Sequence, residues 1–213
     1  MVGGAGPHSG FPGRAATTSK EATVHVDDAI RHRRSHKVFT GEPMTVAVLR
    51  ELIELARWAP NHGLTEPWRF HAALGPSKDA LATVIDATLA AMRKPNEDGD
   101  ARLLAKRTKM KTRIAQAGAV VAVTCPREAG DPLLAREDYG ATCCAIQNLS
   151  LAATARGLAS YWSTGKALDQ PAVRAFWGLR DDQLLVGTLC LGVGALPMKG
   201  RRLHDVDELL RLV

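Results

Sequence analysis

The stretch QLLVGTLCLGVG, residues 183–194, constrains the fold more than any other part of the sequence. It contains no charged residue, and apolar side chains fall on both faces that a β-strand would present. A strand with one face in water would instead alternate apolar and polar residues. We therefore expect these residues to form a central strand of a sheet.

The sequence around this strand predicts a mixture of helices and strands. The run AVVAVTC, residues 119–125, is typical of a second buried strand, and shorter runs predict strands at 68–74 and 158–163. Apolar residues at helical spacing and helix-ending residues predict helices over residues 24–34, 45–58, 78–92, 101–116, 135–156 and 171–177. Long helices combined with few strands indicate the α+β class.

The composition fits one globular domain. The chain has 213 residues, of which 46% are hydrophobic and 23% charged, which is ordinary for a soluble protein with a substantial core. Residues 1–22 are rich in Gly, Pro, Ser and Thr, so we expect a flexible N-terminal arm followed by a single domain over residues 23–213.

The same composition bears on compartment and partners. The four cysteines show no disulfide or zinc spacing, and no N-terminal apolar run is typical of a signal peptide. The longest apolar tract, residues 139–159, is interrupted by polar residues and predicts a buried helix rather than a membrane span. We therefore expect a cytoplasmic protein with reduced thiols. The net charge of +6 fits a solvated surface, or an anionic partner such as nucleic acid, a membrane surface or a phosphate-bearing ligand.

Positive charge is concentrated in RHRRSHK, residues 31–37. Arg33 and Arg34 offer guanidinium groups and Ser35 offers a hydroxyl, a set that suits a phosphate. Two other interpretations stay open on these residues alone. Cations at the end of a helix also favour the helix dipole, and a basic cluster can contact nucleic acid, although no aromatic residues are interleaved here.

Familiar catalytic motifs are missing from the sequence. The LGVGALP stretch, residues 191–197, lacks the third glycine of a dinucleotide fingerprint, and WSTGK, residues 162–166, lacks the glycine spacing of a P-loop. The nearby histidines have no carboxylate at metal-ligand spacing, so we predict no metal site. No nucleophile elbow or carboxylate pair stands out. Anion-binding groups without a nucleophile or base suit an enzyme whose reactive atoms belong to a bound cofactor.

Four segments in order along the chain resemble the FMN-dependent nitroreductase family, and most closely its minimal branch. They are RRSHKVF (33–39), ELARWAPNHGLTEPWRF (54–70), GLASYWSTG (157–165) and LVGTLCLGVGALP (185–197). The resemblance spans roughly residues 26–203 and departs from the family pattern at Lys37, at Gly63-Leu64, and in the order Ser163-Thr164-Gly165.

The resemblance implies an α+β fold in which helices flank a central, mostly antiparallel sheet, and an intertwined homodimer with FMN at the subunit interface. Arg33, Arg34 and Ser35 would hold the phosphate and ribityl chain, with the basic pair Lys199 and Arg201 reaching the phosphate. Trp58 and His62 would approach the flavin from the partner subunit, and one further group would line it from the first subunit: Trp162, Ser163 and Thr164.

The implied activity is an NAD(P)H-dependent flavin oxidoreductase with no catalytic side chain. Hydride passes from NAD(P)H to the flavin N5 and then, in a ping-pong scheme, to a nitroaromatic, quinone or similar acceptor. Other reactions on the same fold are dehalogenation, ring oxidation and consumption of the flavin; a basic nucleic-acid-binding protein is a more distant alternative. We expect neither nucleic acid nor a membrane as a partner. The charged helix at 101–116 is either an exposed face or a cover over the active site, and nothing in the sequence decides between NADH and NADPH.

Overall fold

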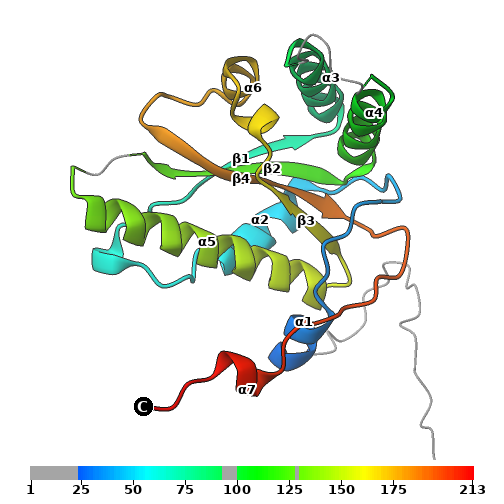
Figure 1. The fold of residues 1–213 in the computed structure, drawn as a ribbon. Helices are drawn as coiled ribbons and strands as arrows, with labels where there is room; N and C mark the ends of the chain where they lie inside the picture. The colour runs from blue at the N-terminus through cyan, green and yellow to red at the C-terminus, as the bar shows by residue number, and fades with distance from the viewer. Residues whose placement is uncertain (1–23, 93–99, 128–129) are drawn as a thin grey trace, which may run out of the picture.

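A computed structural model describes residues 24–92, 100–127 and 130–213 of the chain. Helices cover both faces of a single sheet, with α3, α4 and α6 on one face and α2 and α5 on the other (Figure 1). The predicted N-terminal arm, residues 1–22, lies outside the described residues. The described helices of the α type are α1 (Val26–His32), α2 (Val46–Ala56), α3 (Pro76–Ala91), α4 (Asp100–Gln116), α5 (Pro132–Ala155), α6 (Pro171–Trp177) and α7 (Val206–Leu209).

The sheet has the order β1-β2-β4-β3, and every neighbouring pair is antiparallel. Its strands are β1 (Arg69–Leu74), β2 (Ala119–Pro126), β3 (Ala159–Ser163) and β4 (Gln183–Gly192). The central position predicted for residues 183–194 is confirmed, since β4 lies between β2 and β3. The antiparallel sheet between helices also confirms the predicted α+β class.

Each face of the sheet has its own hydrophobic core. Leu52 of α2 and Ile146 and Leu149 of α5 are fully buried on one face. Leu81 of α3 and Val173 of α6 are fully buried on the other. Burial of each such side chain stabilises the fold by roughly 1.5–3 kcal/mol. The two cores enclose the faces of the sheet, so its two ends are available to form sites.

Helix ends follow from local chemistry. The Thr45 hydroxyl accepts a hydrogen bond of 3.2 Å from the Val48 N–H at the start of α2. Helix α5 begins three residues earlier than predicted, because Asp131 caps it through the Leu133 N–H (2.8 Å) and Pro132 occupies its first position. Gly157 ends α5 with a left-handed φ of 71°, as expected of a glycine after a helix.

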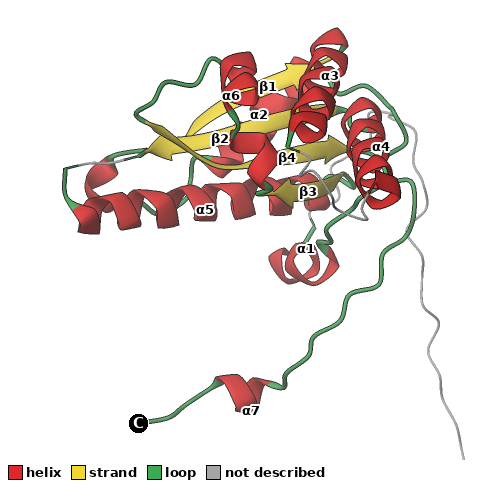
Figure 2. Cartoon of the chain, turned by 45° about the horizontal axis from the view of Figure 1, so that its top comes forward, coloured by secondary structure: helices red, strands yellow, loops and turns green. Residues whose placement is uncertain are grey.

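The C-terminal tail leaves the body of the molecule after β4. It passes close to α1 and then extends away from the sheet to α7, as both ribbon views show (Figure 2). The short helix α7, which the sequence did not predict, begins with a capping box between Asp205 and Glu208. None of the described helices is both long and apolar enough to cross a membrane.

Candidate functional site

The RRSHKVF segment, residues 33–39, lies along the free edge of strand β3. The His36 N–H donates to the Ser160 carbonyl over 2.9 Å, and Ser35 and Ser160 form a parallel bridge. Farther along, the Ala195 N–H donates to the Val38 carbonyl over 3.1 Å. The segment therefore fills the gap between β3 and the chain leaving β4, so residues distant in sequence meet at this corner.

Four cations come together at this corner, and we call them the cation cluster: Arg33, Arg34, Lys199 and Arg201. Arg34 is the member whose guanidinium is held in place by the backbone. Its Nη1 donates to the carbonyls of Arg31 (2.5 Å) and Arg33 (2.7 Å), whereas its Nε is buried and has no hydrogen-bond partner among the described residues. A Cβ on Gly200 would overlap the Arg34 guanidinium. The glycine thus lets the tail cross directly over Arg34, which brings its neighbours Lys199 and Arg201 to the same place.

This cluster has the chemistry of an anion site. Arg33, Lys199 and Arg201 form no ion pair with any acidic residue that the structure describes. Unpaired guanidinium and ammonium groups beside a buried, unsatisfied N–H favour an anion with several acceptor oxygens. Burial, and then the positive charge of Arg34, lower the pKa of His36, so His36 adds no full charge of its own at neutral pH.

The end of β3 forms the next wall of the site. Trp162 leaves 38% of its surface exposed, and its indole occupies the space that a Cβ on Gly187 would need. Ser163, half-buried, faces a small cavity beneath α4, and Thr164 is exposed at the start of the following loop. Ser163 is the last residue of β3 and Thr164 follows it, so one aromatic and two hydroxyl groups succeed one another at the end of the strand whose edge the RRSHKVF segment covers.

Arg113 of α4 and Tyr161 of β3, which the sequence analysis did not single out, connect α4 to this site. The Arg113 guanidinium lies over the Tyr161 ring, 4.2 Å from its centroid, and the Arg113 Nε donates to the Lys37 carbonyl over 3.2 Å. The C-terminal end of α4 is therefore fixed to β3 and to the RRSHKVF segment at once. The charge of the helix was the only signal in the sequence, and it did not distinguish Arg113 from its neighbours.

Trp58 and His62 lie elsewhere in the same chain. Trp58 is 78% exposed, and the His62 Nδ1 is 3.7 Å from the Glu137 carboxylate in the first turns of α5. The cation cluster lies near the other end of α5, by α1 (Figures 1 and 2). A helix of 24 residues is about 36 Å long. The structure therefore brings the arginines, the tail and the β3 residues together but leaves Trp58 and His62 far from them.

The loop that carries His62 has an unusual backbone. Gly63 has a φ of 57°, and the non-glycine residues Leu64 and Glu66 also have positive φ, 55° and 41°. The Asn61 side chain accepts a hydrogen bond of 3.0 Å from the Glu66 N–H and helps to hold this conformation. Such strain is concentrated at functional loops. In this loop Leu64 is 86% exposed.

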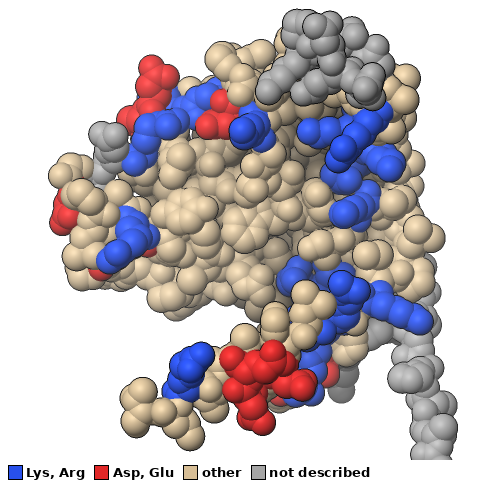
Figure 3. Space-filling model, viewed as in Figure 1, with Lys and Arg blue, Asp and Glu red and all other residues tan. Residues whose placement is uncertain are grey.

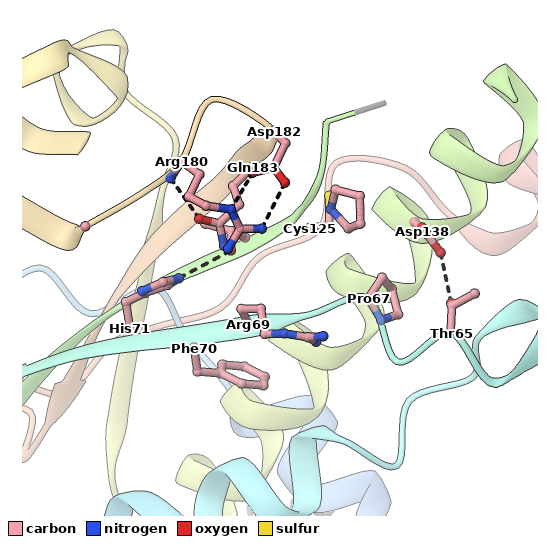
Figure 4. A pocket seen from close by; sticks show the side chains of 13 residues that line it. Thr65, Pro67, Arg69, Phe70, His71, Cys125, Asp138, Arg180, Asp182 and Gln183 are labelled. Carbon is pink, nitrogen blue, oxygen red and sulfur yellow. Dashed lines mark hydrogen bonds and ion pairs between the residues drawn. The ribbon is translucent and has the colours of Figure 1, made fainter. Parts of the chain in front are cut away.

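A separate cavity of about 550 Å³ opens at the opposite end of the sheet (Figure 4). Its polar side chains mostly bind one another: Arg180 pairs with Asp182 over 2.9 Å, and the Gln183 amide donates to Thr124 over 3.4 Å. Burial lowers the pKa of His71 in its wall. None of the residues predicted for the site lines this cavity, so it is distinct from the cation cluster.

Known proteins with similar sequences or structures agree on one family. Residues 30–195 match the family model described as Nitroreductase family. The chain is 32% identical over 166 residues to YfhC of Bacillus subtilis (strain 168), provisionally named an NAD(P)H nitroreductase; the match covers 78% of this chain and 82% of that protein. It is 25% identical over 207 residues to nitrobenzene nitroreductase of Ectopseudomonas oleovorans, which covers 78% and 86% of the two chains.

Solved structures show the same fold. A nitroreductase-like family protein from Bacillus cereus superposes with a TM-score of 0.75 at 26% identity, over 93% of this chain and 99% of that chain. The FMN-dependent nitroreductase NfnB from Mycobacterium smegmatis, in complex with NADPH, superposes with a TM-score of 0.71 at 20% identity, over 88% and 97% of the two chains. The similarity therefore extends over nearly the whole described chain.

Proposed function

The chain belongs to the nitroreductase family, and from that premise we propose that it is an FMN-dependent NAD(P)H oxidoreductase acting on nitroaromatic, quinone or similar acceptors. The observation that carries the proposal is the buried Nε of Arg34, which has no hydrogen-bond partner among the described residues and lies where the tail crosses at Gly200, between Lys199 and Arg201. Relatives named as NAD(P)H nitroreductases support the nucleotide and the acceptor class.

The residues present fit FMN. A phosphate oxygen would supply the acceptor that the Arg34 Nε lacks, and Arg33, Lys199 and Arg201 would neutralise its charge. Ser35 would donate its hydroxyl at the same corner. Bound FMN would supply the redox chemistry, since its ring takes up a hydride from NAD(P)H and passes electrons to an acceptor. The protein has to bind this group, orient it and balance its charge.

The side chains along β3 would orient the ring system. Trp162 offers an apolar surface, and Ser163 and Thr164 offer hydroxyl groups. The Arg113 Nε donates to the Lys37 carbonyl over 3.2 Å, which fixes the Arg113 guanidinium beside the RRSHKVF segment. Fixed positive charge favours the build-up of negative charge at a site during reduction. No side chain here is required to act as a nucleophile or general base.

The site is completed in this proposal by a second copy of the chain. Trp58, Leu64 and His62 are exposed at one end of α5, and the cation cluster lies near its other end. A homodimer would bring the loop of one subunit to the cluster of the other. The tail supports this assembly, because it exposes a run of apolar side chains away from the body: Leu203, Val206, Leu209, Leu210, Leu212 and Val213.

The test begins with purified protein and a visible spectrum after addition of FMN. We expect a yellow complex with quenched FMN fluorescence, bleaching by NAD(P)H without oxygen, and return of the colour when a nitroaromatic or quinone is added. Protein that neither retains nor quenches FMN would overturn the proposal. Protein that binds FMN tightly but oxidises neither NADH nor NADPH would point instead to another reaction on the same fold.

A further inference from the structure

Helix α4 carries a line of cations along one side. Successive residues of an α-helix are about 100° apart, so Arg102, Lys106, Lys109 and Arg113 fall within an arc of about 60°. We call these four residues the α4 stripe. The stripe extends about 16 Å along the helix. Arg102, Lys106 and Lys109 are exposed, and Arg113 is half-buried.

The cations on the other side of α4 have a structural explanation. Arg107 forms two hydrogen bonds with the Asp86 carboxylate of α3, of 2.8 and 2.9 Å. These bonds, and to a smaller extent the charges of Arg107 and Lys111, lower the pKa of Asp86. The negative charge of the Asp86 carboxylate therefore offsets part of the positive charge of Arg107 and Lys111.

The α4 stripe has no such balance. Within the described part of the chain, none of its four residues forms an ion pair with an acidic side chain. Like charges three and four residues apart weaken a helix by a few tenths of a kcal/mol per pair. An unbalanced row of this kind is explained if an anion that is not part of the chain lies along it.

The position of the α4 stripe indicates which anion. Its last member, Arg113, contacts Tyr161 and the Lys37 carbonyl, both in the walls of the proposed flavin site. Figure 3 shows basic side chains gathered over α4 and a second basic group below it, on the same face of the molecule. A ligand whose reactive end lies at the flavin and whose phosphates extend outwards along α4 would place those phosphates against the stripe.

We propose that the α4 stripe binds the phosphates of the nicotinamide dinucleotide and makes the enzyme prefer NADPH to NADH. This inference rests on the proposed function. Both nucleotides carry the pyrophosphate, but only NADPH has a 2′-phosphate, which adds a charge of about −1.5 to −2 at neutral pH. Four cations in a row exceed what a pyrophosphate needs and match a ligand with this third phosphate. Lys106 and Lys109, in the middle of the stripe, would carry most of the discrimination.

The first experiment compares a Lys106→Ala/Lys109→Ala double variant with Lys111→Ala in the FMN-loaded protein. Lys111 is exposed on the same helix but belongs to the α3 side, so it controls for the loss of charge. We expect the double variant to raise KM for NADPH about tenfold and KM for NADH by a smaller factor, because NADH brings only its pyrophosphate to the stripe. Lys111→Ala should leave both KM values as they are.

A binding measurement gives a readout that does not depend on turnover. Titration calorimetry with 2′,5′-ADP should show binding to the FMN-loaded wild type that weakens with salt and is lost in the double variant. Equal kcat/KM values for NADPH and NADH, or equal effects of the double and control variants, would overturn the inference while leaving the proposed function intact. Failure of the wild type to bind FMN, or to oxidise either nucleotide, would instead contradict the proposed function itself.

Discussion

At the scale of single residues, Arg34 is the side chain on which flavin binding would depend most under the proposed function. Its Nε is buried without a partner, and the tail crosses over it at Gly200. We predict that Arg34→Ala weakens FMN binding about 10- to 100-fold, the loss expected from one or two charge-assisted hydrogen bonds. Fluorescence titration with FMN measures the change. Arg31→Ala, which removes an exposed guanidinium that pairs with Asp27, is the matched control and should bind FMN normally.

His71 makes stability depend on pH. Burial lowers its pKa in the folded protein, and a backbone hydrogen bond to Trp177 opposes this only in part. With the folded pKa below the unfolded value of about 6.5, the unfolded state binds the proton first. The associated stability is present above that value and is lost as the pH falls below it.

We therefore expect the urea midpoint to fall between pH 7.5 and 5.5, and to fall less in His71→Gln. His25→Gln, an exposed histidine before α1, should behave like the wild type. Equal pH dependence in all three proteins would show that His71 does not contribute.

Residue-level prediction from the sequence could propose a site where a motif marks one, and it failed where a contact joins distant elements. Arg33, Arg34 and Ser35 were picked out as an anion-binding set, and the structure brings the tail to them. Arg113 was missed because its partners, Tyr161 and Lys37, are 48 and 76 residues away, and helical periodicity reveals only which face is buried.

At the scale of elements, α3 supports α4 through a buried lysine. The Lys78 ammonium is nearly fully buried and donates to the carbonyls of Ala115 (3.2 Å) and Ala117 at the C-terminal end of α4. These carbonyls have no partner within their own helix. We predict that Lys78→Met lowers the free energy of unfolding by about 1–3 kcal/mol. Urea denaturation measures the loss, and Lys109→Met on the exposed face is the control that should change stability little.

The order and type of the elements could be predicted because their signals are local. Apolar runs located all four strands and helical periodicity located the longer helices, whose ends Thr45 and Gly157 help to set in the structure. The start of α5 was placed too late, since Pro132 and Asp131 were interpreted as loop rather than as the first helical residue and its cap. Helix α7 was missed because four residues give too short a pattern.

At the scale of the whole molecule, the C-terminal tail is suited to an interface. Its apolar side chains, including Leu209 and Leu212, are exposed in the single chain, and such a surface is rarely left in water. We predict that Leu209→Asp/Leu212→Asp weakens the dimer at least tenfold and lowers FMN retention with it. Sedimentation equilibrium measures the association. Asp207→Asn, on the same short helix, is the control, and an unchanged dimer in the double variant would contradict this role of the tail.

The length of α5 has a genetic consequence. Because it separates the cation cluster from the Trp58 loop, each site of the proposed homodimer would use one half from each chain, and two differently damaged chains would repair each other. Arg34→Ala mixed with Trp58→Ala/His62→Ala should regain up to about a quarter of the wild-type sites after subunit exchange, since half the dimers are mixed and each has one intact site. Neither variant alone should recover. Complementation of this kind means that the smallest unit on which selection acts is the pair, not the polypeptide.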